Sequence, residues 1–119
     1  MKRVIFVFVV SGPLKGHKYI IKSDSKILIG RSSDANIRIG YDDFCSRQHA
    51  MLYWDKETCF IEDLNSTNGT FVNSERVSTR KGLKKGDIIG LGKTELIVAE
   101  SGSSDNKKGK PEDDISYDD

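Results

Sequence analysis

Three short segments of the sequence combine hydrogen-bond donors with turn-forming residues: 30–33, 45–49 and 65–69. The first two carry Arg31 and Arg47, whose planar guanidinium groups suit the oxygens of a phosphate. Because each hydrogen bond to a charged group contributes roughly 1.5–3 kcal/mol net, three or four such donors could hold one phosphate selectively. The chemistry expected of these segments is therefore anion binding, provided that the fold brings them together.

The other donors in these segments are hydroxyl and amide groups. Ser46 and Thr67 supply hydroxyls, and Asn68 supplies an amide that can bond to both the carbonyl and the N–H of a peptide backbone. Asn68-Gly69 is also a strong hairpin-turn signal, so a turn role and a binding role are compatible at this position. The set therefore combines phosphate donors with a contact for a peptide main chain.

Short apolar runs separated by turn residues surround these segments throughout residues 1–100, which is typical of all-β domains. The expected strands are residues 4–10, 19–21, 27–29, 37–39, 50–54, 59–64, 70–72, 87–91 and 94–99. No stretch of ten residues has the apolar period of a helix. We therefore expect two β-sheets packed as a sandwich, or a small barrel, with the donor segments in its loops.

Length and charge restrict the class of protein. The chain has 119 residues and a formal net charge of +1, which suits one domain and argues against a general nucleic-acid binder. Residues 1–100 hold 16 basic and 12 acidic side chains, whereas residues 101–119 hold 3 and 6. The second segment has almost no apolar residues, so we predict a disordered acidic tail or linker after a domain at residues 1–100.

We expect no membrane segment, no metal site and no cofactor. The apolar run at residues 4–10 is short for a signal peptide and has no cleavage pattern, so it favours a buried strand. No other segment could span a bilayer. Cys45 and Cys59 lack metal-ligand spacing and are expected to be reduced thiols, which predicts a cytoplasmic location, or a nuclear one in a eukaryote.

The donor segments together resemble the forkhead-associated (FHA) domain family. The pattern of that family is Gly-Arg, then Ser-Arg-x-His, then Asn-Gly, and here it reads Gly30-Arg31, Ser46-Arg47-Gln48-His49 and Asn68-Gly69. The blocks are in order and suitably spaced, and the resemblance covers about residues 3–99. It implies a β-sandwich of about eleven strands that binds phosphothreonine peptides with the loops at one end.

The resemblance also implies a role for each matching position. The positions that correspond to phosphate-binding residues are Arg31, Ser46, Arg47 and Thr67. Asn68 corresponds to the residue that anchors the peptide main chain. The positions that correspond to loop-shaping residues are Gly30, His49 and Gly69. For His49 we therefore expect a buried side chain that is hydrogen bonded to the backbone.

We therefore expect a non-enzymatic module, a monomer as an isolated domain, that binds a phosphothreonine protein in trans after a Ser/Thr kinase has acted. Residues 101–119 contain no threonine, so that segment cannot supply the ligand. The alternative is a scaffold domain that works independently of phosphorylation. A small hydrolase using Ser46 and His49 is disfavoured, because the sequence offers neither a matching acid nor nucleophile-elbow glycines.

Overall fold

Strands are the only regular elements in the computed structural model, which describes residues 4–100. The strands are β1 (Ile5–Val9), β2 (Lys18–Ile21), β3 (Lys26–Gly30), β4 (Ile37–Arg38), β5 (Ala50–Asp55), β6 (Thr58–Asp63), β7 (Thr70–Val72), β8 (Glu75–Arg76), β9 (Arg80–Gly82), β10 (Ile88–Leu91) and β11 (Thr94–Glu100). No helix in this range is long and apolar enough to cross a membrane. The all-β class and the strand number are thus confirmed, whereas the prediction for residues 101–119 lies outside the described residues.

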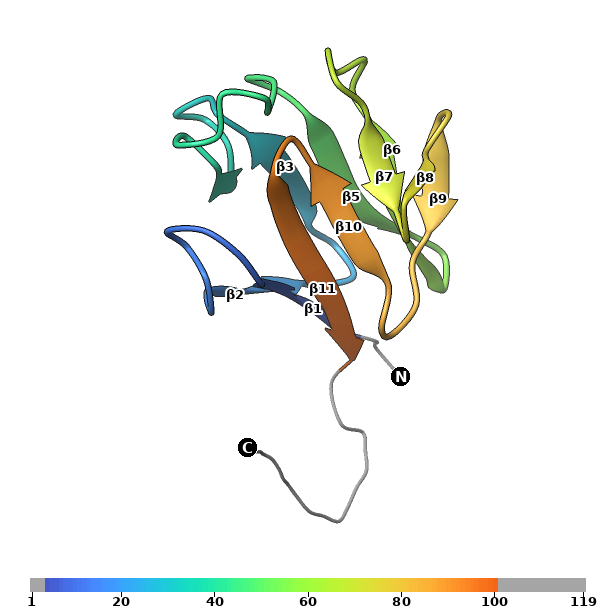
Figure 1. Ribbon diagram of the computed structural model, residues 1–119. Helices are drawn as coiled ribbons and strands as arrows, with labels where there is room; N and C mark the ends of the chain where they lie inside the picture. Colours follow the sequence, from blue (N-terminus) through green and yellow to red (C-terminus); the bar gives the residue numbers. More distant parts are fainter. Residues whose placement is uncertain (1–3, 101–119) are drawn as a thin grey trace.

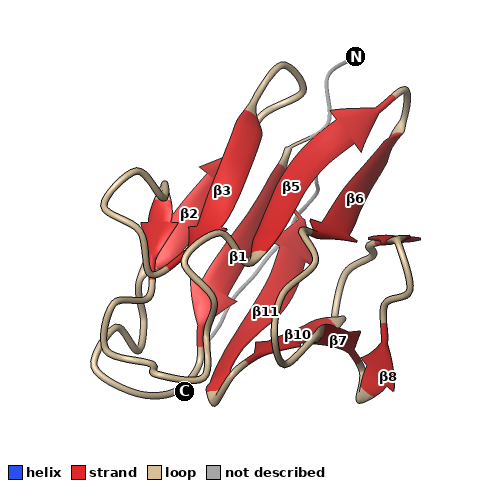
Figure 2. Ribbon diagram, turned by 90° about the horizontal axis from the view of Figure 1, so that it is seen from above, coloured by secondary structure: helices blue, strands red, loops and turns tan. Residues whose placement is uncertain are grey.

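The strands form two sheets (Figures 1 and 2). One sheet has six strands in the order β2-β1-β11-β10-β7-β8, and the other has five in the order β4-β3-β5-β6-β9. Neighbouring strands are antiparallel except for β3 and β4, which are parallel. Each sheet has two free edges, so the fold is a sandwich and not a closed barrel.

The core lies between the sheets because side chains alternate along each strand. In β1, for example, Ile5, Val7 and Val9 are buried, while Phe6 and Phe8 are half-buried on the outer face. This explains why the sequence shows a continuous apolar run there. Burying a large aliphatic side chain contributes about 1.5–3 kcal/mol, so the core supplies a rigid base for the loops.

Two strands, β8 and β9, have no counterpart among the strands expected from the apolar runs. Both are polar, and most of their residues are exposed. β8 pairs with β7 through a hairpin at Asn73 and Ser74, which have φ angles of 52° and 71°. β9 pairs with β6. Both strands lie at sheet edges, where they form by hydrogen bonding to a neighbouring strand and not by burial of apolar side chains. A search of the sequence for apolar runs could therefore not find them.

Strand register explains why the loops gather at one end. Ile29 of β3 is opposite Ala50 of β5, and Ala50 is opposite Asp63 of β6. The end of β3, the start of β5 and the end of β6 are therefore neighbours. The segments that join these strand ends are the first loop (residues 31–36), the second loop (residues 39–49) and the third loop (residues 64–69), at the upper end of the sandwich in Figure 1.

Candidate functional site

The first and second loops are joined by backbone hydrogen bonds immediately after β3. Arg31 N–H donates to the Ser46 carbonyl at 3.1 Å, and Ser32 N–H donates to the Arg47 carbonyl at 3.1 Å. A Cβ atom on Gly30 would lie 2.0 Å from the Arg47 carbonyl oxygen. Only glycine therefore allows the two segments to approach so closely, which gives Gly30 a physical role in shaping the loops.

Arg31 and Arg47 are held differently. Nε of Arg31 donates to the Cys45 carbonyl at 2.7 Å, and the half-buried side chain has no partner in residues 4–100 for its two terminal nitrogens. The Arg47 side chain is exposed and makes no hydrogen bond to the described residues. The loops therefore present one fixed guanidinium group and one that projects into solvent.

Ser46 joins the second loop to the third. Its Oγ accepts a hydrogen bond from the Thr67 N–H at 2.9 Å, so its own hydroxyl hydrogen is available to an acceptor. Thr67 is exposed beside it. The hydroxyls of Ser46 and Thr67, from loops 21 residues apart in sequence, therefore belong to one surface.

Asn68 is fixed by the second loop as well. Its Nδ2 donates to the Phe44 carbonyl at 2.9 Å, and the residue is exposed. Its Oδ1 has no partner within residues 4–100, so the amide can still accept a hydrogen bond from a peptide N–H. Gly69 follows with a φ of +90°, a backbone conformation that favours glycine and turns the chain into β7.

His49 lies beneath these donors. It is fully buried, its Nδ1 accepts from the Ser46 N–H at 2.9 Å, and its Nε2 lies 2.8 Å from the Gly69 carbonyl oxygen. Because Nδ1 accepts, the hydrogen-bond network assigns the proton to Nε2, which donates to Gly69. The buried, backbone-bonded histidine expected from the sequence is thus found, and it connects the second and third loops.

A half-buried carboxylate that the sequence did not single out, Asp63, supports the third loop. Asp63 accepts the hydroxyl hydrogens of Ser66 and Thr70 and the Ser66 N–H. Burial acts to raise the pKa of Asp63, but the hydrogen bonds from Ser66 and Thr70 outweigh it, so this pKa lies below its ordinary value. The three-residue spacing from Asp63 to Ser66 is the sequence signal that could have found this support.

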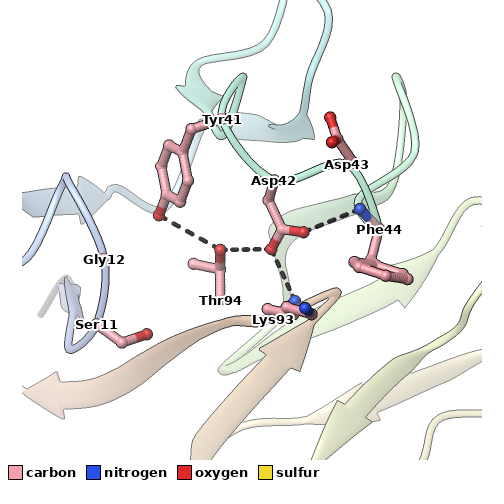
Figure 3. Close-up of a pocket in the computed structure, with 8 residues that line it drawn as sticks. All are labelled: Ser11, Gly12, Tyr41, Asp42, Asp43, Phe44, Lys93 and Thr94. Atoms are coloured by element: carbon pink, nitrogen blue, oxygen red, sulfur yellow. Dashed lines mark hydrogen bonds between the residues drawn. The ribbon is translucent and has the colours of Figure 1, made fainter.

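A second carboxylate, the buried Asp42, supports the second loop (Figure 3). It accepts the Phe44 N–H at 3.0 Å, the Lys93 N–H at 2.7 Å and the Thr94 hydroxyl at 2.7 Å. Burial again acts to raise the pKa of Asp42, and the Thr94, Lys93 and Phe44 hydrogen bonds bring it below its ordinary value. A Cβ on Gly92 would lie 2.7 Å from Asp42 Oδ1, so the β10–β11 turn needs glycine there.

A groove of about 280 Å³ lies beside the second loop. Tyr41, Phe44 and Lys93 contribute to its lining, and Figure 3 shows the β10–β11 turn meeting the loop there. The Phe44 side chain is 48% exposed, and Lys93 Nζ lies 4.7 Å from the centroid of its ring. The groove therefore combines an aromatic surface with the positive charge of Lys93 and the carboxylates of Asp42 and Asp43.

No group of three or more potential metal ligands occurs in residues 4–100. Cys45 and Cys59 are buried and free. Burial raises the pKa of the Cys45 thiol to about 11, with a further contribution from Asp42, and raises that of Cys59 to about 12. Both thiols are therefore protonated near neutral pH and are poor metal ligands.

The FHA domain model matches residues 27–92, more than half of the chain. This chain belongs to the FHA domain family. FhaA, an FHA domain-containing protein of Mycobacterium tuberculosis, is 43% identical over 83 residues, which is 70% of this chain and 15% of FhaA. FhaB of the same species is 34% identical over 91 residues, which is 76% of this chain and 57% of FhaB. The chain thus spans only part of these relatives.

Solved structures of FHA domains share the same fold. The FHA domain of FhaA, complexed with the intracellular domain of Rv3910, is 37% identical with a TM-score of 0.70, over 79% of this chain and 98% of that one. An FHA domain of Arabidopsis thaliana is 33% identical with a TM-score of 0.77, over 87% and 92% of the two chains. The FHA resemblance is therefore confirmed in both sequence and structure.

Proposed function

We propose that this FHA domain binds phosphothreonine segments of partner proteins, so that a Ser/Thr kinase controls the association. The observation that carries the proposal is the junction of three loops around Ser46, which joins the donor groups into one surface. A structure with 36% identity and a TM-score of 0.72 comes from a study of phosphothreonine-dependent FHA domain interactions, which supports the same ligand class.

The phosphate would be held by groups from all three loops. Phosphorylation adds about −1.5 to −2 charge and three strong acceptor oxygens. The terminal nitrogens of Arg31 can donate to two of these oxygens, and the hydroxyls of Ser46 and Thr67 can donate to the same group. Arg47, which projects into solvent beside them, adds a second positive charge.

The peptide main chain would be anchored by Asn68. Its Oδ1 accepts from a backbone N–H of the ligand, while the Phe44 carbonyl keeps the amide in one orientation. The threonine methyl of the ligand adds burial worth about 0.8 kcal/mol, which corresponds to roughly a fourfold preference over phosphoserine. Main-chain anchoring together with a phosphate contact gives recognition of a peptide rather than of free phosphate.

We also propose that the module works by binding alone, as a monomeric domain at residues 1–100. His49 bonds to the backbone N–H of Ser46 and to the Gly69 carbonyl, so neither ring nitrogen faces the Ser46 hydroxyl. A serine nucleophile requires a base within hydrogen-bond reach of its hydroxyl. This arrangement supports a binding role for Ser46 rather than a catalytic one.

The test is a titration of the full chain with matched threonine, phosphothreonine and phosphoserine peptides, in which fluorescence anisotropy measures binding. We expect the phosphothreonine peptide to bind at least about tenfold more tightly than the plain one, and Arg31→Ala to remove most of that difference. Arg80→Ala is the matched control, because Arg80 is exposed and ion-paired with Asp55 on the outer sheet face. Equal binding of plain and phosphorylated peptides would support a scaffold domain, and turnover of a peptide would support an enzyme.

A further inference from the structure

The β7–β8 hairpin returns the chain to the third loop. Its turn residues, Asn73 and Ser74, both have positive φ, as a tight two-residue hairpin requires. The register places Arg76 opposite Phe71, two residues beyond Gly69. A hairpin that follows directly from the third loop therefore sends β8 back beside it.

Arg76 rests against the backbone of the third loop. A Cβ built on Gly69 would lie 3.0 Å from Cζ, 3.1 Å from Nε and 3.2 Å from Nη2 of Arg76. The guanidinium group therefore lies against the backbone of the Asn68-Gly69 turn at Gly69. No sequence motif indicated this position, because it depends on the pairing of β8 with β7.

The charge of Arg76 is uncompensated in the part of the chain that the structure describes. Arg76 is exposed and has no hydrogen bond or ion pair to any of residues 4–100. Arg80, four residues later, donates to Asp55 at 3.0 Å and lies over the Phe60 ring at 3.7 Å. Arg80 is thus occupied within the domain, whereas the donors of Arg76 are free to bind a ligand.

We infer that Arg76 is a specificity-determining residue that binds a second anionic group of the phosphopeptide, a carboxylate or a second phosphate. This inference rests on the proposed function, because Asn68 must hold the peptide across the Gly69 turn. Thr67 N lies 2.9 Å from Ser46 Oγ, and Gly69 is two residues further on. Because consecutive Cα atoms are about 3.8 Å apart, the Gly69 Cα lies at most about 8 Å from that of Thr67, so we expect the second anion within roughly 10 Å of the phosphate. An extended peptide spans that distance in about two to four residues.

The experiment uses peptides with one central phosphothreonine. At each position two to four residues before or after it, the peptides carry alanine, glutamate or a second phosphothreonine. Affinities are measured for the wild-type full chain, for Arg76→Gln and for Arg80→Gln as the matched control. We expect one position at which glutamate in place of alanine increases the affinity of the wild-type chain about three- to tenfold. We expect Arg76→Gln to lose this increase in affinity and Arg80→Gln to keep it. A larger gain from phosphothreonine than from glutamate at that position would identify a second phosphate as the preferred group.

The outcomes separate the two proposals. If phosphorylation of the central threonine has no effect on affinity, the proposed function fails. If phosphorylation matters but no acidic position improves binding, or the improvement persists in Arg76→Gln, only the inference about Arg76 fails. A purely structural role would weaken Arg76→Gln binding to the alanine and glutamate peptides equally and lower its melting temperature, and this result would also overturn the inference.

Discussion

The second and third loops are each supported by an aspartate, but the hydrogen bonds of the two aspartates differ in how far they reach along the chain. Asp63 bonds to Ser66 and Thr70, three and seven residues further along the chain. Asp42 bonds to Lys93 and Thr94, which are 51 and 52 residues away. The hydrogen bonds of Asp63 therefore stay within the third loop and the strands that flank it, whereas those of Asp42 connect the second loop to the β10–β11 turn.

We expect the largest loss of stability when either carboxylate is removed. Asp42→Ala leaves the Lys93 N–H and the Thr94 hydroxyl without their acceptor, and we expect it to lower the free energy of unfolding by about 3 kcal/mol. We expect about 2 kcal/mol for Asp63→Ala, because Asp63 is less buried. Urea denaturation measures both values, and equal losses would contradict the ordering.

Glycine substitutions test the long-range support without touching the carboxylate. Gly92 has a φ of +60° and faces Asp42, whereas Gly86 has a φ of +93° and no neighbour within 4 Å of a built Cβ. Both alanine variants bear a backbone penalty of about 1 kcal/mol. We expect Gly92→Ala to be destabilised by about 1 kcal/mol more, because three hydrogen bonds prevent Asp42 from moving aside. Equal melting temperatures for the two variants would show that the contact is easily relieved.

Acidification should reduce the contributions of Asp42 and Asp63 to the stability of the fold. The pKa values of Asp42 and Asp63 lie below the ordinary 3.8 in the folded protein. Their contributions to stability are therefore complete above that value and are lost as the pH falls through the lower folded values. We expect the stability gap between wild type and Asp42→Asn, measured by urea denaturation, to shrink between about pH 7 and about pH 3, and the gap for Asp63→Asn likewise. Gaps that stay constant with pH would contradict the depressed pKa values.

The same difference in range explains what the sequence could predict. The strands with buried faces and the donor segments depend on local patterns, and these patterns predicted where they lie. The hairpin expected at Asn68-Gly69 is wrong, because β6 and β7 belong to different sheets and the turn joins one sheet to the other. The contact of Asp42 with Lys93 depends on how two sheets pack, and the place of Arg76 depends on an edge-strand pairing. No short-range sequence pattern predicts either of these two contacts, because the residues that form them come together only in the folded chain.

The tether between Arg31 Nε and the Cys45 carbonyl has a consequence for the entropy of binding. A free arginine side chain carries roughly 2 kcal/mol of rotamer entropy, and folding has already removed part of it at Arg31. Arg47 retains its rotamer freedom in solvent and must give it up when it contacts an anion. We therefore expect calorimetry of phosphopeptide binding to show a mainly enthalpic contribution from Arg31, and a contribution from Arg47 that is largely offset by entropy.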